Sequence, residues 1–180
     1  MSYPTIVAPP CVTIHTFSVE ALGPKEGSTG NNLAANAAGT VYPSANLAIY
    51  IPMWVMQPLV AVQMFAYSGA TVGTNNIDVG IYDGAGNKLV SSGSTLTANA
   101  SDLQVFNITD TLLGTGLHYL AVAMDGTTDT LFRINNSIPL LRGWGVRQQA
   151  SAFALPATAT FAVMAQNYLP TIGLTTRSVL

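Results

Sequence analysis

Residues 77–93, IDVGIYDGAGNKLVSSG, carry the most informative secondary-structure pattern in this sequence. Ile77, Val79 and Ile81 alternate with smaller or more polar residues, which predicts a strand with one buried face and one partly wet face. The sequence DGAGN at 83–87 then supplies glycine, aspartate and asparagine, which tolerate positive φ or bond to their own backbone in tight loops. The stretch therefore predicts a β-hairpin whose return strand starts directly after the loop.

Short strands separated by turn residues continue on both sides of this hairpin, a pattern typical of sandwiches and barrels. No amphipathic helix is predicted anywhere. The predicted fold is all-β, a single antiparallel β-sandwich of jelly-roll-like type. Its expected strands cover residues 47–51, 59–67, 76–82, 88–92, 103–108, 117–124, 130–134 and 160–166.

The chain divides by composition into three parts. Residues 1–45 form an extended N-terminal arm with one strand at 11–19, and residues 46–137 form the sandwich core. Residues 138–180 form a C-terminal extension, partly strand, that packs on the sandwich or on a neighbour. Within the arm, the segment from residue 23 to 40 has too little apolar content to order itself alone, so we expect it to stay mobile or to lie across a neighbouring subunit.

The surface is expected to be covered largely by partners. Charged residues make up 8% of the 180 positions, hydrophobic residues make up 49%, and the net charge is −2. A usual charged fraction is about 25%, and charge is what keeps soluble proteins apart. We therefore expect a homo-oligomer, a homotrimer in the first instance. The chain has no run of basic residues, so nucleic acid is not an expected partner.

The apolar stretch at 47–66 is long enough to cross a bilayer, but its composition argues against a membrane helix. Pro52 and Pro58 would interrupt a helix twice, and the content is β-branched and aromatic. Two strands about a turn are predicted instead, and no membrane contact. The first residues lack the charged start and apolar run of a secretory signal, and the single Cys11 cannot form an internal disulfide. Synthesis and use in the cytoplasm are expected.

Catalytic and metal-binding patterns are missing from the sequence, so no enzyme, no cofactor and no metal site are predicted. No hydrolase, phosphate-binding or zinc-protease motif stands in a suitable context, and His118 lies on an apolar strand. Loop oxygen atoms at two places resemble calcium ligands in type, but their spacing matches no known cage, and turn formation explains them better. These loop residues are Asp83, Asn87, Asp125 and Asp129.

Aromatic residues are the remaining candidates for an interface or a ligand site: Trp54, Tyr119, Trp144 and Tyr168. In the strand LHYLAVAM at 117–124 both faces are largely apolar, so one face is a candidate interface. Exposed aromatics on a sandwich can also stack on sugars. A role in the core or in a subunit interface is favoured, because aromatics are the usual anchors there.

The sequence IDVGIYDGAGNKLVSSGST at 77–95, followed by LQVFNITDTLLGTGLHYLAVAMDGTTDTLFRI at 103–134, resembles small β-sandwich virion proteins of tailed bacteriophages. The similarity covers residues 46–134. It implies a place in the virion, synthesis in the host cytoplasm and contact with other virion proteins such as the major capsid protein. Such proteins serve as capsid decoration or cement, as head fibres, or as tail and receptor-binding parts, and no catalytic residues are implied.

Two functions follow as hypotheses. The first is a capsid decoration or cement protein, favoured because the chain lacks the long stalk or repeats of a tail fibre. The alternative is a receptor- or carbohydrate-binding module on a head fibre or tail, with a glycan of the host surface as ligand. A third, a polysaccharide hydrolase, would need a carboxylate pair that the sequence does not offer.

Overall fold

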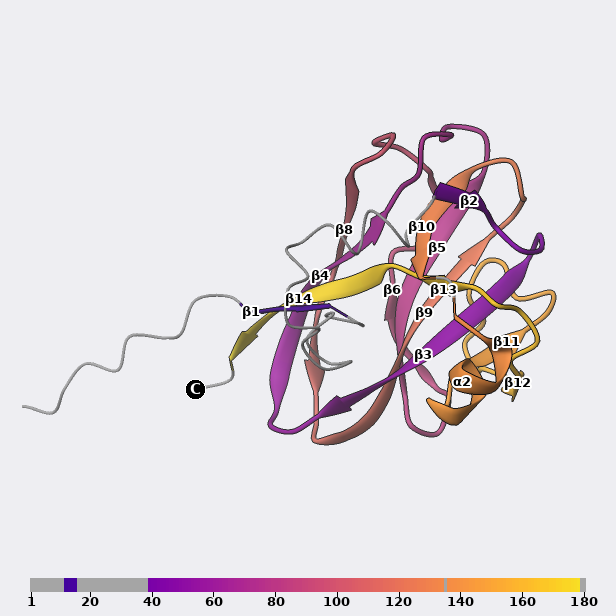
Figure 1. The fold of residues 1–180 in the computed structure, drawn as a ribbon. Helices are drawn as coiled ribbons and strands as arrows, with labels where there is room; N and C mark the ends of the chain where they lie inside the picture. Colours follow the sequence, from indigo (N-terminus) through magenta and orange to yellow (C-terminus); the bar gives the residue numbers. More distant parts are fainter. Residues whose placement is uncertain (1–11, 16–38, 135, 179–180) are drawn as a thin grey trace, which may run out of the picture.

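The computed structural model describes residues 12–15, 39–134 and 136–178 (Figure 1). Every strand pairing in these residues is antiparallel, and one short helix accompanies the strands. The predicted all-β antiparallel class is confirmed. The elements are β1 Val12–His15, β2 Gly39–Val41, β3 Leu47–Val55, β4 Leu59–Tyr67, β5 Asn76–Asp83, β6 Lys88–Ser91, β7 Thr95–Leu96, β8 Leu103–Leu113, β9 Gly116–Met124, β10 Thr130–Ile134, α2 Ile138–Gly143, β11 Arg147–Gln149, β12 Ala162–Val163, β13 Leu169–Pro170 and β14 Ile172–Ser178.

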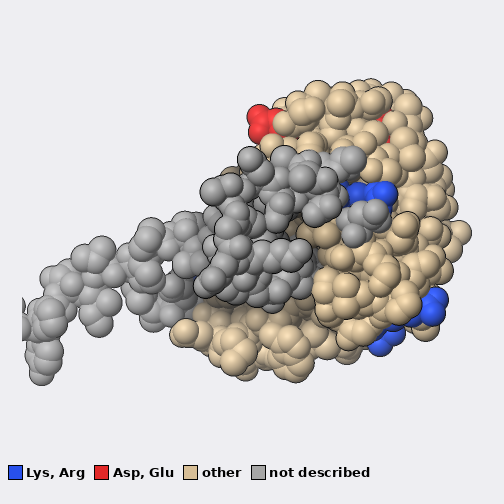
Figure 2. Space-filling view, in the orientation of Figure 1, with Lys and Arg blue, Asp and Glu red and all other residues tan. Residues whose placement is uncertain are grey.

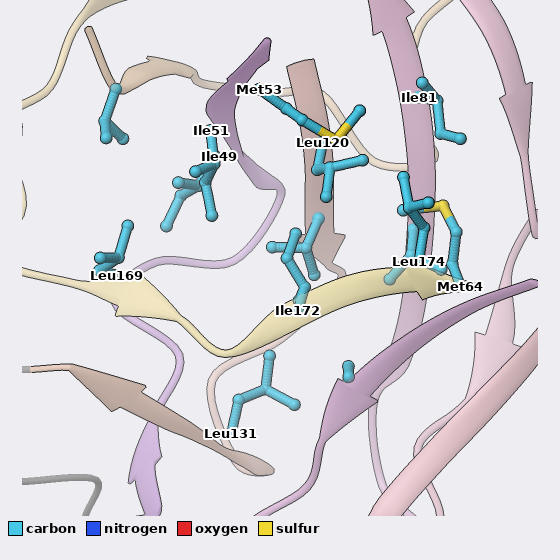
Figure 3. Packing of buried hydrophobic residues seen from close by; sticks show 14 of the residues in the cluster. Ile49, Ile51, Met53, Met64, Ile81, Leu120, Leu131, Leu169, Ile172 and Leu174 are labelled. Carbon is cyan, nitrogen blue, oxygen red and sulfur yellow. The ribbon is translucent and has the colours of Figure 1, made fainter. Parts of the chain in front are cut away.

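The strands form two larger sheets and one small one. The seven-stranded sheet has the order β12-β11-β3-β9-β5-β6, with β7 also paired to β5, and the four-stranded sheet has the order β1-β14-β4-β8. The small sheet is β13-β10-β2. Side chains of both larger sheets meet in one core, where residues of β3 and β9 face residues of β4 and β14 (Figure 3). The residues of this core that Figure 3 labels are Ile49, Ile51, Met53, Met64, Ile81, Leu120, Leu131, Leu169, Ile172 and Leu174.

Strand β9 is buried on both faces. Leu120, Val122 and Met124 belong to the core between the sheets, while Tyr119 and Ala121 belong to a second cluster on the outer face. Chain from the 150–161 region covers this outer face with apolar side chains, namely those of Ala152, Phe153, Leu155, Ala159 and Phe161. The face that was a candidate interface is therefore covered by the chain itself.

The apolar stretch at 47–66 forms β3 and β4 with a three-residue turn between them, as predicted. Pro52 lies inside β3, where its missing N–H is tolerated because β11 pairs only with the first part of β3. Within the described residues, none of the helical structure has the length and apolar character needed to cross a bilayer.

The C-terminal region differs from the prediction in detail. Strand β14 was not predicted, yet it pairs with β4 along its whole length and buries Ile172, Leu174 and Thr176. The strand predicted at 160–166 is reduced to the two residues of β12. A short helix, α2, stands where none was expected, because a proline is tolerated in a first helical turn and Leu141 is buried.

Strand β1 confirms the centre of the strand predicted at 11–19, whose other residues lie outside the described part. Most of the predicted arm segment 23–40 also lies outside it, since the description resumes at Gly39 with β2.

The covering segment is fixed to the sheet at Leu155. The N–H of Leu155 donates to Oδ2 of Asp78 at 3.0 Å, and its carbonyl accepts from Nζ of Lys88 at 2.7 Å. Burial raises the pKa of Asp78, which the N–H of Leu155, the charge of Lys88 and the Ser92 hydroxyl partly offset. The Leu155 side chain then packs directly over Gly80, where a Cβ would lie 2.9 Å from Cδ1 of Leu155 and 2.9 Å from the carbonyl oxygen of Val90.

We predict that Gly80→Ala destabilises the fold by about 1–3 kcal/mol, the usual cost of overpacking. The Leu155 side chain can turn away, but the backbone carbonyl of Val90 is held in a strand pair and cannot. Urea unfolding measures the change. Gly114→Ala is the matched control, because a Cβ at Gly114 meets nothing within 4 Å, and it should be nearly neutral. Equal stability of the two variants would contradict the close packing at Gly80.

Candidate interaction surface

Two connections between the larger sheets lie side by side at one end of the molecule (Figure 1, lower end). One is the β3–β4 turn and the other is the β8–β9 turn. Val55 of β3 pairs with Gly116 of β9, and Leu59 of β4 pairs with Leu113 of β8, so both turns start and finish at the same level. At this end the chain therefore passes from one larger sheet to the other in two adjacent turns.

Three large apolar side chains are exposed at this end, and we call them the apolar tip: Trp54, Met56 and Leu112, with exposed fractions of 69%, 83% and 62%. Neighbours in a strand point to opposite faces. Because Met53 and Leu113 point into the core between the sheets, Trp54 points outward from the seven-stranded sheet and Leu112 points outward from the four-stranded sheet.

The apolar tip is uncharged. The sequences WVMQPL at 54–59 and TLLGTGL at 111–117 contain no Asp, Glu, Lys or Arg. In Figure 2 the lower left of the described surface is tan, and the blue side chains in the lower half lie at the right. The exposed ion pair between Arg177 and Asp110, 2.6 Å from Nη2 to Oδ2, lies just beyond Leu112 along β8. An exposed pair of this kind adds little stability.

The four aromatics predicted as interface or ligand residues are not brought together. Trp54 alone is exposed, and Trp144 is half-buried against the core. Tyr119 is buried beside Phe161, with ring centroids 4.6 Å apart. Tyr168 is buried too, and its hydroxyl donates to the carbonyl of Thr40 at 3.0 Å.

Met56 and Leu112 were not predicted as site residues. The signal that could have found Leu112 is the alternation within β8, where Leu112 and Leu113 are adjacent leucines that cannot both face the core. Met56 carries no such signal, because a methionine between two apolar strands is as consistent with a buried core position as with an exposed one. Its exposure follows from its place in the β3–β4 turn.

The opposite end of the molecule consists of polar loops fastened by one buried carboxylate. Oδ2 of Asp129 accepts hydrogen bonds from the N–H groups of Thr74 at 2.8 Å and Asn75 at 2.7 Å, and from the hydroxyl of Thr97. Oδ1 of Asn75 in turn accepts the N–H groups of Thr128 and Asp129. The β4–β5, β7–β8 and β9–β10 connections are thereby tied together.

The pKa of Asp129 reflects this role. Burial raises it, but the hydrogen bonds from Thr97, Asn75 and Thr74 outweigh burial and leave the pKa below its usual value. Such a carboxylate stabilises the folded state while it is ionised.

The other loop carboxylates considered as calcium ligands also serve their own turns. Asp83 accepts from the Asn87 side chain at 2.9 Å and from the N–H groups of Ala85 and Asn87, and these bonds lower its pKa against a small effect of burial. Both oxygens of Asp125 accept from Asn76. Within the described ranges, no group of three or more His, Cys, Asp or Glu residues could hold a metal ion.

Comparison with known proteins adds no relative. No family model, no curated protein and no solved structure matches this chain.

We predict that Asp129→Asn lowers the free energy of unfolding by about 1–3 kcal/mol at neutral pH, because hydrogen bonds to a charged acceptor are replaced by bonds to a neutral one. The folded-state pKa is lowered, so this contribution is complete above the usual carboxyl pKa of about 4 and is lost as the pH falls through the folded-state value. Unfolding of the two proteins at neutral and acid pH measures the difference, which should shrink in acid.

Asp110→Asn is the control, since its carboxylate is exposed and should matter little at either pH. A stability gap for Asp129→Asn that does not change with pH would show that its charge is not what holds the loops.

Proposed function

We propose that this chain is a non-enzymatic structural protein of a tailed-phage virion, a capsid decoration or cement protein that attaches through its apolar tip. It would be made in the host cytoplasm, associate as a homotrimer and bind other virion proteins such as the major capsid protein. The observation that carries the proposal is the apolar tip itself: three large apolar side chains, more than half exposed, beside two turns whose sequences contain no charged residue.

Large exposed apolar side chains at one end of a molecule are candidates for a contact surface, because large apolar patches are uncommon on free soluble proteins. Tryptophan and methionine are enriched in the centres of protein interfaces, and charged residues are depleted there. The tip has this composition. Burial of its side chains against a partner would be favourable by roughly 25 cal/mol for each Å² of apolar surface removed from water.

The fold suits a subunit that locks other subunits in place. Its central sheet is covered on both faces by its own chain, so docking at the tip leaves the core intact. The low charge of the chain supports close packing among neighbours, and the resemblance of residues 46–134 to phage virion proteins supports the choice of particle.

The test is binding to particles assembled without this chain. We expect the double variant Trp54→Ser, Met56→Ser to occupy such particles with at least about tenfold lower affinity, because two interface anchors at about 1 kcal/mol or more each exceed one decade. Quantitative mass spectrometry of purified particles measures the occupancy. Both side chains are exposed, so the fold should be unaffected.

Val163→Ser is the matched control, because Val163 is 55% exposed on β12 at the edge of the seven-stranded sheet, away from the tip. It should bind as the unchanged chain does. Particles that never take up the chain would refute the virion role, and full occupancy by the double variant would refute docking through the tip.

A receptor- or carbohydrate-binding role is the second candidate, favoured by the exposure of Trp54 alone. An exposed indole can stack on a sugar ring. Binding to a glycan array that is lost on Trp54→Ala, and kept on Trp144→Ala and Met56→Ser, would favour this module over a decoration protein, because protein docking would use Met56 as well.

A further inference from the structure

The four-stranded sheet is completed by its first strand in sequence, β1. Strand β14 lies between β4 and β1, and without β1 the backbone groups on that side of β14 would form an open sheet edge (Figure 1). We infer that β1 is exchanged between copies, so that β1 of one chain pairs with β14 of a second copy of this chain. The inference deepens the proposed structural role by naming how neighbouring subunits are joined.

The contact is small and self-contained. Val12–His15 pairs with Gly173–Thr176, four residues on each side, whereas β4 pairs with β14 from Ile172 to Ser178. Four residue pairs contribute few backbone hydrogen bonds, and each adds only modestly to stability. Separating β1 from β14 of the same chain therefore costs little free energy. The same hydrogen bonds form again when β1 pairs with β14 of another copy.

The chain between β1 and the rest of the fold is long. β1 ends at His15, and the next described strand, β2, begins at Gly39 and pairs with β10 in a different sheet. Residues 16–38 are 23 positions in the sequence. A stretch of that length can span up to about 75 Å, against a diameter of roughly 35–40 Å for a folded unit of this size. β1 can reach the β14 of an adjoining subunit.

The partner is a second copy because the donor and the acceptor are encoded in one chain. In dilute solution, residues 16–38 connect β1 to its own fold and so favour pairing within one chain. In a packed assembly, β14 of a neighbouring copy is present at a comparable effective concentration and competes for β1. An arm exchanged in this way joins two subunits without enlarging the contact between their folded bodies.

Disulfide trapping distinguishes the two pairings. Thr13 lies opposite Thr175 in the β1–β14 register, and opposed positions of antiparallel strands are within the Cα distance that a disulfide requires. Two chains with different affinity tags, both carrying Cys11→Ser, are co-expressed; one carries Thr13→Cys and the other Thr175→Cys. We expect most of the purified oligomer to yield a disulfide-linked pair carrying both tags on a non-reducing gel.

Thr109→Cys in place of Thr175→Cys is the matched control, since Thr109 is exposed on β8 at the other edge of the same sheet and should yield no mixed pair. A single chain with Thr13→Cys and Thr175→Cys completes the test. If it closes the disulfide only within itself, or if no disulfide forms in either arrangement, strand exchange is refuted. Neither result depends on particle binding, so failure here leaves the decoration role to be decided by occupancy.

Discussion

The central sheet must be covered on both of its faces, and the rest of the molecule follows from that constraint. Strands β3, β9 and β5 are flanked by neighbours on both edges and carry apolar side chains on both faces. One face is covered by the four-stranded sheet. The other is covered by irregular chain around Leu155, because no further sheet is available for it. The hydrophobic effect thus explains why residues 150–161 lie over this face.

Covering a sheet with irregular chain creates a second problem, since such chain has backbone groups without strand partners. Side chains on the outer face of the sheet supply those partners. The Tyr82 hydroxyl donates to the carbonyl of Pro156 at 2.6 Å, and Asp78 and Lys88 satisfy Leu155. Burial raises the pKa of Tyr82 strongly, which keeps it protonated as a donor. The two ends of the molecule also differ: at one end three loops are joined by hydrogen bonds to Asp129 and Asn75, and the other end carries the short β3–β4 and β8–β9 turns.

The regular part of the fold could be predicted from the sequence because its signals are local. β4 and β10 have the predicted bounds, and the β5–β6 hairpin forms around the predicted loop. Strand β14 could not be predicted, since its inward positions include Thr176 and its sequence IGLTTRS alternates weakly. The irregular segment around Leu155 shows no regular spacing of apolar residues that would predict a strand or a helix. Its position is fixed by contacts with residues about 75 positions earlier, such as Asp78.

The candidate surface was harder to predict than the fold. Trp54 was correctly singled out, but Tyr119 and Tyr168 are buried, because an aromatic on a strand looks the same in sequence whether its face is open or covered. What covers a face is decided by distant segments. The exposure of Met56 and Leu112 depends in the same way on two turns meeting at one end.

The position of β14 also has a consequence for biosynthesis. It pairs with β4 on one side and with β1 on the other, so a strand made late by the ribosome separates two that were made early. The four-stranded sheet cannot close until translation has passed residue 178, and pairings this distant in sequence form slowly. A nascent or prematurely terminated chain would leave the apolar side of β4 open and would be recognised by chaperones and proteases. Only chains synthesised through β14 can complete the four-stranded sheet, so the fold itself distinguishes complete chains from truncated ones.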